Sequence, residues 1–585
     1  MGMAVTGETH LMGKPQHVST LLWKCWDTMK TNEPIYTICK YSPLELLSGF
    51  GLKAERLDPN PASFSCAESC GHPNLCGYGK AVLEEVLTRN IRCLLLVDCC
   101  DVCRRIYDIL LNRGGMKFLY LLPLPHKNGS GEITRMEREL RRLSDALCQM
   151  TGREFDLPLA LDAWRRACQA EVLSTPHILL TGAHGGSSLL RTVQARSNLP
   201  IVDETCTGNR GLLQPPDLPD RDMFFRTYAQ ALLCQEKPCM RMQFREEGQN
   251  PNAVGVICHT MKFCDYYGFR YAAMKKKWKV PTLKIETDAT PQSSGQLHTR
   301  LDAFFETIQP RKKVEVAKGV VNYVAGVDSG SASTDAVILD GEKRIVASTV
   351  LPTGAGAAAG VQKALNEVLR QAGLNVEDLA AIVATGYGRE TVGTGNTSVT
   401  EITCHAKGAH HLFPQARTVI DIGGQDSKVI CLDGNGNVTN FVMNDKCAAG
   451  TGRFLENMAR TLQLSLDEMS ELGLRWKKDV TISSMCTVFA ESEVVSLVAA
   501  NTETADIIHG LNQAVANKTA SLVRRIHGEA PYIMSGGVAK NRGVVKALEE
   551  ALNAEIYVPQ QAQICGALGA ALIAWEEVQY GQSER

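Results

Sequence analysis

The sequence has almost no net charge and no long apolar run. Its 62 Lys and Arg residues nearly balance its 63 Asp and Glu residues, which gives no electrostatic basis for binding nucleic acid or an anionic membrane. Because no run of about 18 uncharged apolar residues occurs, no transmembrane helix is expected. The N-terminal residues lack a basic region followed by an apolar segment. We therefore expect a cytoplasmic protein whose partners are small molecules and other proteins.

Cysteine is scarce in the second half of the chain and frequent in the first. Of the 21 cysteines, 16 precede position 310 and five follow it. In a large chain without a secretory signal, this distribution argues against a disulfide framework and favours thiolate ligands for iron or zinc. The alternative is that several of these cysteines are small buried hydrophobic side chains.

The length of the chain and the change in cysteine density predict more than one domain. At 585 residues the chain is too long for a single hydrophobic core. The segment 309–322 reads QPRKKVEVAKGVVN; it is short, basic and weakly patterned, and we interpret it as a solvated linker. The predicted domains are residues 1–308 and residues 323–580.

Apolar, β-rich runs alternate with helical segments through residues 1–308. The expected strands include IRCLLLV, MKFLYLL, HILLT, AVGVI and TLKIET, and the order of strand, loop and helix predicts βαβ units with a parallel sheet. Several cysteines follow expected strands: Cys99, Cys100, Cys103, Cys206 and Cys258. The carboxyl ends of parallel strands are where α/β proteins gather ligands. Helix N-termini at such loops also favour the thiolate form.

The second half contains one strand, loop and strand pattern twice. YVAGVDSGSASTDAVIL carries Asp328 at a strand end, and TVIDIGGQDSKVICL carries Asp421 at the equivalent place. Such carboxylates hold Mg²⁺ through water, and backbone N–H groups of the loops can cradle phosphate oxygens. A single Asp-Gly hairpin is usually only a turn, but the repetition and a third glycine pair, Gly536 and Gly537, favour nucleotide. The pattern predicts a duplicated domain without a Walker A loop, with nucleotide between its halves.

The motifs between residues 323 and 577 resemble one family of ATPases. In order, they read GVDSGSASTDAVILD, ATGYGRE, DIGGQDSKVI, NDKCAAGTGRFLE, SSMCTVFAESEV, SGGVAKNRGVV and GALGAAL. They closely resemble the activator ATPases of 2-hydroxyacyl-CoA dehydratases, of the BadF/BadG/BcrA/BcrD type. The resemblance implies an actin-like, Hsp70-like and sugar-kinase-like fold that binds ATP and Mg²⁺. It also implies a homodimer through the ATPase domain, with one 4Fe-4S cluster held by Cys447 and Cys486 of each chain.

The residues that the resemblance places at the nucleotide site lie in these motifs. The expected catalytic residues are Asp328, Asp421 and Gln425. The expected contacts to ATP and Mg²⁺ include these three and Ser329, Gly330, Ser331, Ser333, Gly386, Gly423, Gly424, Asp426, Lys428, Gly450, Thr451, Gly452, Glu456, Gly536 and Gly537. Asp335 departs from the pattern, because many relatives have Lys at that position.

The cysteines of the second half support the shared cluster. A cubane takes four thiolates, yet only Cys447 and Cys486 stand in Gly- or Ser-flanked loops before expected helices, so a dimer would supply all four. Gly450, Thr451 and Gly452 place a phosphate-type loop beside Cys447, so that a shift of either helix on nucleotide binding would be felt at the cluster. The alternative is a buried thiol at a helix start.

The first half resembles a second family. The motifs are YTICKYSPLELLSGFG, HPNLCGYGKAVLEE, DCCDVCRRIYD, DETCTGNRG, KPCMRM, ICHTMKFCDYYG and LKIETDATPQSSGQLHTRLDAF. They resemble the 2-hydroxyglutaryl-CoA dehydratase D-component family, whose members include dehydratase subunits, benzoyl-CoA reductase subunits and double-cubane cluster proteins. The resemblance implies an iron-sulfur cluster at strand ends between Rossmann-like subdomains. Three cysteines would hold a single 4Fe-4S cubane, and six would hold two cubanes that share a sulfide.

The resemblance carries over to particular cysteines. Cys76, Cys100 and Cys258 match the recurrent cysteine loops of the family, and Cys206 and Cys239 match segments typical of the double-cubane branch. The candidates for the sixth ligand are Cys39 and Cys66, and the alternatives at any position are Cys70, Cys99, Cys103, Cys234 and Cys264. The C-x-x-C pair of Cys100 and Cys103 would by itself also fit zinc or a redox dithiol.

Two polar groups of the first half have both a functional and a structural interpretation. Glu286, Thr287 and Asp288 end an expected strand, where they would contact the cluster or substrate, or begin a capped helix. His259 stands next to Cys258, where it would donate protons in a reduction or serve a structural role.

These features together predict a fusion of a cluster-bearing module with its own ATP-driven reductase. Ferredoxin or flavodoxin would supply single electrons, and ATP would drive them into the N-terminal cluster for reduction of a small molecule. The alternative is a component of a 2-hydroxyacyl-CoA dehydratase, in which the electron initiates radical dehydration of an acyl-CoA. A minor alternative is an Hsp70-like sensor or chaperone, which leaves the cysteines without a role.

Overall fold

The computed structural model describes most of the chain. The described residues are 23–25, 33–169, 175–217, 220–242, 251–275, 277–288, 290, 294–308, 322–354, 356–386, 397–444, 448–482 and 486–583. The chain forms two compact units that divide between Ser294 and Gly295. Helix α10 (Ser294–Ile308) therefore groups with the second unit, whereas the sequence boundary was expected after it, at residue 308. The expected linker lies outside the described residues except for Asn322.

The first unit contains two sheets with parallel cores. One has the order β1 (Trp23–Cys25), β5 (Phe118–Pro123), β4 (Cys93–Asp98), β2 (Ile35–Thr37) and β3 (Ala54–Arg56), with only β1 antiparallel. The other has the order β7 (Ile201–Thr205), β6 (His177–Gly182), β8 (Ala253–Met261) and β9 (Thr282–Thr287), all parallel. This confirms the α/β class expected from the alternation of apolar runs and helices.

Helices cover both faces of the β4–β5 sheet. The helices of this unit are α1 (Leu44–Ser48), α2 (Ser65–Cys70), α3 (Gly77–Thr88), α4 (Asp101–Arg113), α5 (Ser130–Thr151), α6 (Leu157–Ala167), α7 (Gly186–Gln194), α8 (Arg221–Leu233) and α9 (Asp265–Lys275). Leu94 and Leu96 of β4 pack in one core with α4, whereas Leu95 and Val97 pack in another with α5. Because neighbouring strand residues face opposite sides, a strand covered on both sides is apolar throughout.

The second unit repeats one sheet arrangement. The first sheet has the order β12 (Ile345–Pro352), β11 (Ser333–Asp340), β10 (Tyr323–Ser329), β13 (Leu379–Gly386) and β14 (Thr397–Ser398). The second has the order β17 (Val438–Asn444), β16 (Ser427–Leu432), β15 (Thr418–Ile422), β18 (Tyr532–Ser535) and β19 (Ile556–Tyr557). Each begins as an antiparallel meander and continues with parallel strands. The two predicted hairpins are β10–β11 and β15–β16, so the duplication is confirmed.

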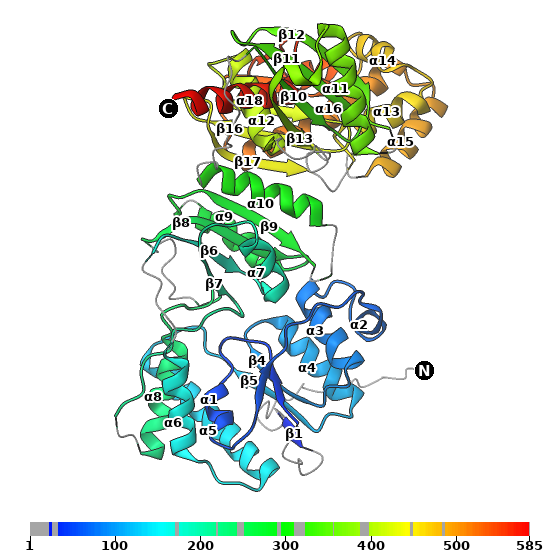
Figure 1. The fold of residues 1–585 in the computed structure, drawn as a ribbon. Coiled ribbons are helices and arrows are strands. Elements are labelled where there is room, and N and C mark those ends of the chain that lie inside the picture. The colour runs from blue at the N-terminus through cyan, green and yellow to red at the C-terminus, as the bar shows by residue number, and fades with distance from the viewer. Residues whose placement is uncertain are drawn as a thin grey trace, which may run out of the picture. The chain divides into compact units, whose positions relative to one another are not determined.

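Two helices of the second unit join its sheets. The helices after α10 are α11 (Ala357–Ala372), α12 (Glu401–Leu412), α13 (Gly452–Thr461), α14 (Leu466–Leu472), α15 (Thr487–Ala499), α16 (Thr504–Arg525), α17 (Arg542–Leu552) and α18 (Cys565–Ser583), with short 3₁₀ turns at Val376–Asp378 and Gly537–Lys540. Helix α18 packs on β10 and β13, α12 packs on β15 and β16, and the two helices pack on each other (Figure 1).

Glycine permits this close helix crossing. A Cβ atom on Gly408 of α12 would lie 2.2 Å from the carbonyl oxygen of Cys565, and one on Gly569 of α18 would lie 1.8 Å from that of Cys404. Real Cβ atoms do not approach backbone so closely, so larger residues would force the helices apart. The GALGAAL motif therefore sets the distance between the halves of this unit. Among the described residues, no helix has the length and apolar character needed to cross a bilayer.

Candidate nucleotide and metal sites

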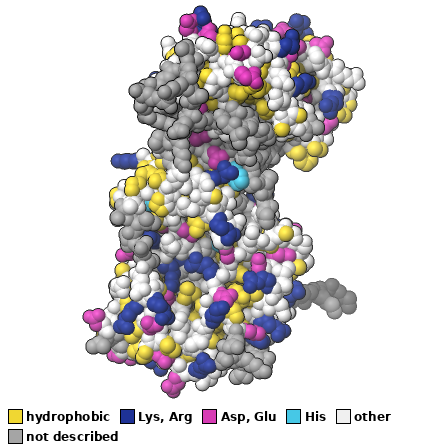
Figure 2. Space-filling model, viewed as in Figure 1, with side chains coloured by type: hydrophobic (Ala, Val, Ile, Leu, Met, Phe, Trp, Pro, Cys, Tyr) yellow, Lys and Arg dark blue, Asp and Glu magenta, His cyan; other side chains and the backbone are white. Residues whose placement is uncertain are grey.

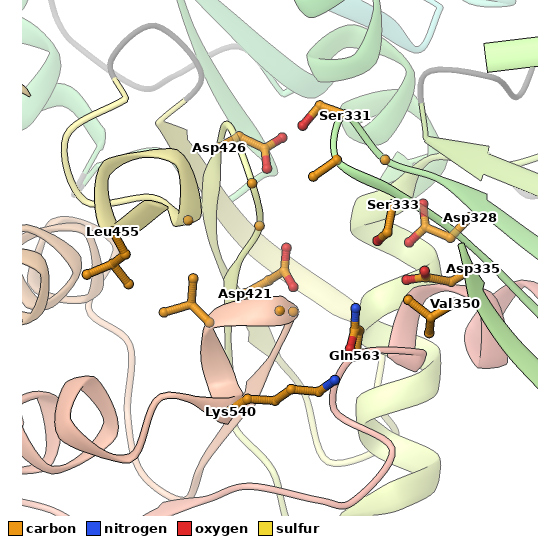
Figure 3. Close-up of a pocket in the computed structure, with 18 of the residues that line it drawn as sticks. Asp328, Ser331, Ser333, Asp335, Val350, Asp421, Asp426, Leu455, Lys540 and Gln563 are labelled. Atoms are coloured by element: carbon orange, nitrogen blue, oxygen red, sulfur yellow. The ribbon is translucent and has the colours of Figure 1, made fainter. Parts of the chain in front are cut away.

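A cavity of about 420 Å³ lies between the two hairpins of the second unit. Its residues come from the loops after β10, β15 and β18 and from the helices α12, α13 and α14 (Figure 3). The expected contacts that line it are Asp328, Gly330, Ser331, Ser333, Asp421, Gly423, Gly424, Asp426, Lys428, Gly452, Glu456, Gly536 and Gly537. Of the other expected residues, Ser329, Gly386, Gln425, Gly450 and Thr451 do not line it. Gln425 is exposed, although the sequence indicated a catalytic role for it.

Two of the glycines have matching roles in the two halves. Gly386 ends β13 and Gly536 follows β18, and both have positive φ angles, 75° and 86°. A Cβ on Gly386 would lie 2.8 Å from Oδ1 of Asp328, and one on Gly536 would lie 2.8 Å from Oδ1 of Asp421. Side chains at these positions would displace the carboxylates that the hairpins present. Gly386 therefore supports the site without lining the cavity.

His405 of α12 lies between the two hairpin carboxylates. Its Nε2 is 3.5 Å from Oδ2 of Asp328, and its Nδ1 is 3.4 Å from Oδ1 of Asp421 and 3.2 Å from Oγ of Ser535. Burial opposes the charged imidazole, but the carboxylates of Asp421 and Asp328 raise the pKa of His405 well above its usual value. A cationic imidazole therefore balances both acids. No motif of the sequence marks His405 as a site residue.

Lys428 of β16 is a second buried cation at the cavity. Its Nζ lies 2.9 Å from Asp426, 3.2 Å from Asp421 and 3.3 Å from Glu401. Burial opposes the charge, and these three carboxylates raise the pKa of Lys428. Burial also raises the pKa of Glu401 to about 7, although Lys428 opposes the change. Glu401 and His405 stand one helical turn apart on α12, so this helix contacts the charges of both hairpins.

Asp335 faces Asp328 across the first hairpin. The two residues pair in the antiparallel register of β10 and β11, and both line the cavity (Figure 3). Burial and the negative charge of Asp328 raise the pKa of Asp335 to about 8. Its Oδ1 atom is buried and has no hydrogen-bond partner within the described part of the chain. A carboxyl group at this position is thus held in its neutral form near pH 7.

A second cavity, of about 50 Å³, lies within the first unit and is lined by eight cysteines. They are Cys39, Cys76, Cys99, Cys100, Cys103, Cys206, Cys239 and Cys264. The Sγ atom of Cys103 lies 3.6 Å from that of Cys99 and 3.5 Å from that of Cys100, so these three could bind one metal ion together. Cys76 and Cys100 are the N-cap residues of α3 and α4, as expected for cysteines placed between strands and helices.

The cavity brings together five of the seven expected cluster ligands of this unit. Cys39, Cys76, Cys100, Cys206 and Cys239 line it, whereas Cys258 and Cys66 do not. Cys258 lies inside β8, paired with Thr181 and Lys284, because this strand continues to Met261, past the strand end expected before Cys258. Cys66 is exposed in the first turn of α2. Of the alternatives, Cys99, Cys103 and Cys264 line the cavity, and Cys70 and Cys234 do not.

The donors of this cavity suit an iron-sulfur cluster. Burial raises the pKa of Cys76 to about 12, and burial with the neighbouring Cys239 raises the pKa of Cys206. Burial thus favours the protonated form of these two thiols, and a bound metal would release their protons. Arg241 lines the same cavity, with its guanidinium 3.7 Å from Sγ of Cys264, and would balance part of a cluster's negative charge. Soft sulfur donors select iron-sulfur clusters, zinc or copper, and eight exceed the four that zinc takes.

One histidine lines the cysteine cavity, but it is not the one that the sequence indicated. His184 stacks on Tyr78 with ring centroids 4.2 Å apart, and its Nδ1 is 2.7 Å from Oγ1 of Thr207. Its Nε2 is 3.4 Å from Asp58. His259 instead bonds Oγ1 of Thr287 at 2.9 Å, and burial lowers its pKa to about 4. His259 is therefore neutral and lies outside the cavity lining.

The expected cluster ligands of the second unit are Cys447 and Cys486. Cys447 lies outside the described residues. Cys486 is the N-cap of α15 and is partly exposed. The helix that follows exposes apolar side chains: Val488 is 66% exposed and Phe489 65%. Figure 2 shows hydrophobic side chains at the lower right edge of this unit, where Figure 1 draws α15, while charges of both signs are mixed elsewhere on the visible face.

Two family models match the chain. Residues 325–574 match the BadF/BadG/BcrA/BcrD ATPase family, and residues 39–169 and 157–308 match the 2-hydroxyglutaryl-CoA dehydratase D-component. The 2-hydroxyisocaproyl-CoA dehydratase activator of Clostridioides difficile is 44% identical over 45% of this chain and 98% of its own. The chain belongs to the BadF/BadG/BcrA/BcrD ATPase family. It also contains a D-component segment, so both resemblances of the sequence are confirmed.

Other relatives belong to the same group of ATPases. The (R)-2-hydroxyglutaryl-CoA dehydratase activating ATPase of Acidaminococcus fermentans is 47% identical over 44% of this chain and 98% of its own. A solved structure of the Clostridium difficile activator with bound ADPNP is 44% identical, covers 45% of this chain and 98% of that one, and has a TM-score of 0.43.

Proposed function

We propose that this protein is an ATP-driven, low-potential electron-transfer enzyme that carries its electron acceptor in the same chain. The observation that carries the proposal is the pair of cavities in one polypeptide. One is the nucleotide-type cavity of an ATPase family, and the other is lined by eight cysteines. The product would be a reduced small molecule. Relatives of the second unit are named as dehydratase activators, which supports the ATP-driven role.

The residues of the first cavity suit MgATP. Asp328 and Asp421 would hold Mg²⁺ through water, and the loops at Gly330 and Gly423 would bind phosphate oxygens. His405 pairs with both carboxylates and Lys428 pairs with that of Asp421, so the two cations orient the acids in the protein. Asp421 is the candidate to position the attacking water, because it is 2% exposed and bonded to both Lys428 and Ser535.

The residues of the second cavity suit an iron-sulfur cluster of one or two cubanes. Cys76, Cys100, Cys206 and Cys239 with Cys39 and one of Cys99, Cys103 or Cys264 would supply the six thiolates that a double cubane needs. When bound, such a cluster stores and delivers single electrons. Arg241 and the hydroxyl of Tyr267, 3.2 Å from Sγ of Cys239, would tune its potential through charge and hydrogen bonding.

We further propose a homodimer with a 4Fe-4S cluster between the two ATPase units, held by Cys447 and Cys486 of each chain. The exposed apolar side chains of α15 support this, because they begin next to Cys486 and would be covered by a second chain. Ferredoxin or flavodoxin would reduce this shared cluster, and the cytoplasm would supply both.

The required energy explains the use of ATP. Moving one electron from about −400 mV to about −700 mV spans roughly 300 mV, or about 7 kcal/mol at 59 mV for each tenfold change. Tuning a cluster inside one fixed protein environment does not supply this energy. Hydrolysis of ATP in a domain that contacts the donor cluster would supply this energy.

Iron quantification after anaerobic purification tests the proposal. Because the shared cluster gives half of its irons to each chain, a single N-terminal cubane predicts about six irons per chain and a double cubane about ten. Cys447→Ser should remove about two irons per chain. Asp421→Asn should abolish ATP hydrolysis and ATP-dependent electron delivery, measured by EPR, while the iron content stays unchanged. A colourless, iron-free, folded protein would refute the proposal.

A second candidate function is activation of, or membership in, a 2-hydroxyacyl-CoA dehydratase. The D-component match and the names of the relatives favour it. In that case ATP-dependent reduction should cause loss of water from a 2-hydroxyacyl-CoA, with each electron recycled rather than consumed. Product analysis by mass spectrometry distinguishes this outcome from net reduction. A sensor or chaperone role remains the weakest candidate, because it gives no use to a cavity lined by eight cysteines.

A further inference from the structure

We propose that Glu306 is a positioning residue of the nucleotide site, and that α10, the helix carrying Glu306, responds to nucleotide through α12. The proposal rests on the proposed function, because it requires nucleotide in the second unit. It assigns to α10 the role of carrying the nucleotide state toward the cysteine-bearing half of the same chain.

The carboxylate of Glu306 caps the N-terminal end of α12. It accepts hydrogen bonds from the backbone N–H of Thr400, at 3.1 Å, and from the hydroxyl groups of Thr400 and Thr403. Thr400 is the N-cap residue of α12, but its own side chain makes no capping bond to a helix amide. A negative charge at a helix N-terminus is favourable because of the helix dipole. Glu306 thus bonds the backbone N–H of the N-cap residue from α10, as the third-residue Glu of a capping box does from within the helix.

An apolar contact accompanies this cap. Ala303, one turn before Glu306, is fully buried in the same hydrophobic cluster as Ile402 and Ala406 of α12. Thr400 itself is only 1% exposed. The interaction therefore combines a buried apolar contact with three hydrogen bonds, unlike the isolated surface ion pairs that contribute little.

The same end of α12 belongs to the nucleotide site. Glu401 directly follows Thr400 and bonds Lys428 at 3.3 Å, and His405, one turn later, lies between Asp328 and Asp421. Both side chains line the cavity. A change in the charges that Glu401 and His405 face would shift the first turn of α12, and Glu306 is bonded to that turn.

The contact joins the two family segments of the chain. Glu306 lies in the segment 157–308 that matches the D-component, whereas α12 lies in the segment 325–574 that matches the ATPase family. In the chain, α10 follows β9, and the backbone of Asp288, just after β9, lies against Gly77. A Cβ on Gly77, next to Cys76, would lie 2.5 Å from the carbonyl oxygen of Asp288. The proposal is that a displacement of α10 is transmitted along the chain to this strand end, which supports a candidate ligand.

Hydrogen exchange of the full-length protein, with and without Mg²⁺ and AMPPNP, tests the proposal. In the wild type, nucleotide should slow exchange in the loops at 328–331 and 421–424, in α12 and in α10. In Glu306→Ala, the loops should keep their protection, while the nucleotide-dependent protection of α10 falls at least threefold. The matched control is Glu576→Ala, which removes a 2.7 Å ion pair with Lys407 on the partly exposed side of α12 and should behave like the wild type.

The hydrogen-exchange results test the role of Glu306 separately from the proposed function. Protection of the loops without any response of α10 in the wild type would refute the role of Glu306 and leave the proposed function intact. A full α10 response in Glu306→Ala would refute it too. Absence of loop protection would refute the proposed function itself. Glu306→Gln keeps one acceptor oxygen and should retain about half of the wild-type nucleotide-dependent protection of α10 and about half of the wild-type kcat for ATP hydrolysis, with KM changed less than twofold. A purely structural role of Glu306 would instead lower Tm without lowering kcat relative to KM.

Discussion

The imidazole of His405 lies 3.5 Å from the carboxylate of Asp328, so a cation from one half of the ATPase unit contacts the acid of the other. His405 comes from α12, which packs on the second sheet, whereas Asp328 ends a strand of the first. Its second nitrogen faces Asp421 at 3.4 Å. The histidine therefore neutralises the two carboxylates on which the proposed MgATP site depends, at the point where the two halves meet.

We expect His405→Gln to lower kcat for ATP hydrolysis at least tenfold. The neutral side chain leaves buried Asp421 and partly buried Asp328 without their common counter-charge, and a lost hydrogen bond to a charged group costs about 1.5–3 kcal/mol. Steady-state ATPase assays and calorimetric Tm measurements check this. The matched control is His527→Asn, because His527 is exposed and Asn tolerates its positive φ of 55°. Unchanged kcat in His405→Gln would contradict the role assigned here.

Asp335→Asn should stabilise the nucleotide-free protein at alkaline pH. In the folded state the pKa of Asp335 is raised to about 8, so this carboxyl binds its proton more tightly when folded than when unfolded. Stability from that proton is present at low pH and is lost as pH rises toward and through 8. Asn is neutral at every pH and avoids this loss. The Tm difference between Asp335→Asn and wild type should grow in favour of the variant from pH 5 to pH 8.5; a constant difference would contradict it.

Single Cys→Ser variants should separate the cavity cysteines from the other cysteines. Cys206→Ser and Cys239→Ser remove thiols that line the cavity, and we expect each to lower the iron content of the anaerobically purified protein by a third or more. Cys258→Ser should retain its iron, because this side chain lies within β8 outside the cavity lining. Cys148→Ser, at an exposed position of α5, is the control. Loss of iron in Cys258→Ser with full iron in Cys206→Ser would refute the assignment.

The elements with a strong local signal could be predicted from the sequence. Asp328 and Asp421 end apolar strands and are followed by glycine-containing turns, so their hairpins could be expected from alternation and turn residues alone. The residues that α12 contributes to the cavity could not be predicted in this way. Glu401 and His405 lie inside a helix rather than in a glycine-containing loop, and only the packing of α12 against both halves brings them to the cavity.

The cysteines of the cavity could likewise be predicted only where a local signal marks their position. Cys76 and Cys100 stand at helix starts, where spacing along the chain is informative, and both line the cavity. Cys258 also appeared to follow a strand, but β8 runs on to Met261, so the loop cysteine that lines the cavity is Cys264. Strand ends are hard to locate from sequence when apolar residues continue past them. An error of a few residues there moves a side chain from a loop into a sheet.

Phe489→Asp should weaken self-association without unfolding the ATPase unit. Phe489 and Val488 are about two-thirds exposed at the start of α15, directly after Cys486, and a charge there opposes burial between two chains. Sedimentation of the anaerobic protein should shift from dimer toward monomer, and iron per chain should fall by about two as the shared cluster is lost. Val376→Asp is the matched control, because Val376 is also exposed but lies in the turn before β13. A Phe489→Asp protein that stays dimeric with full iron would place the dimer contact elsewhere.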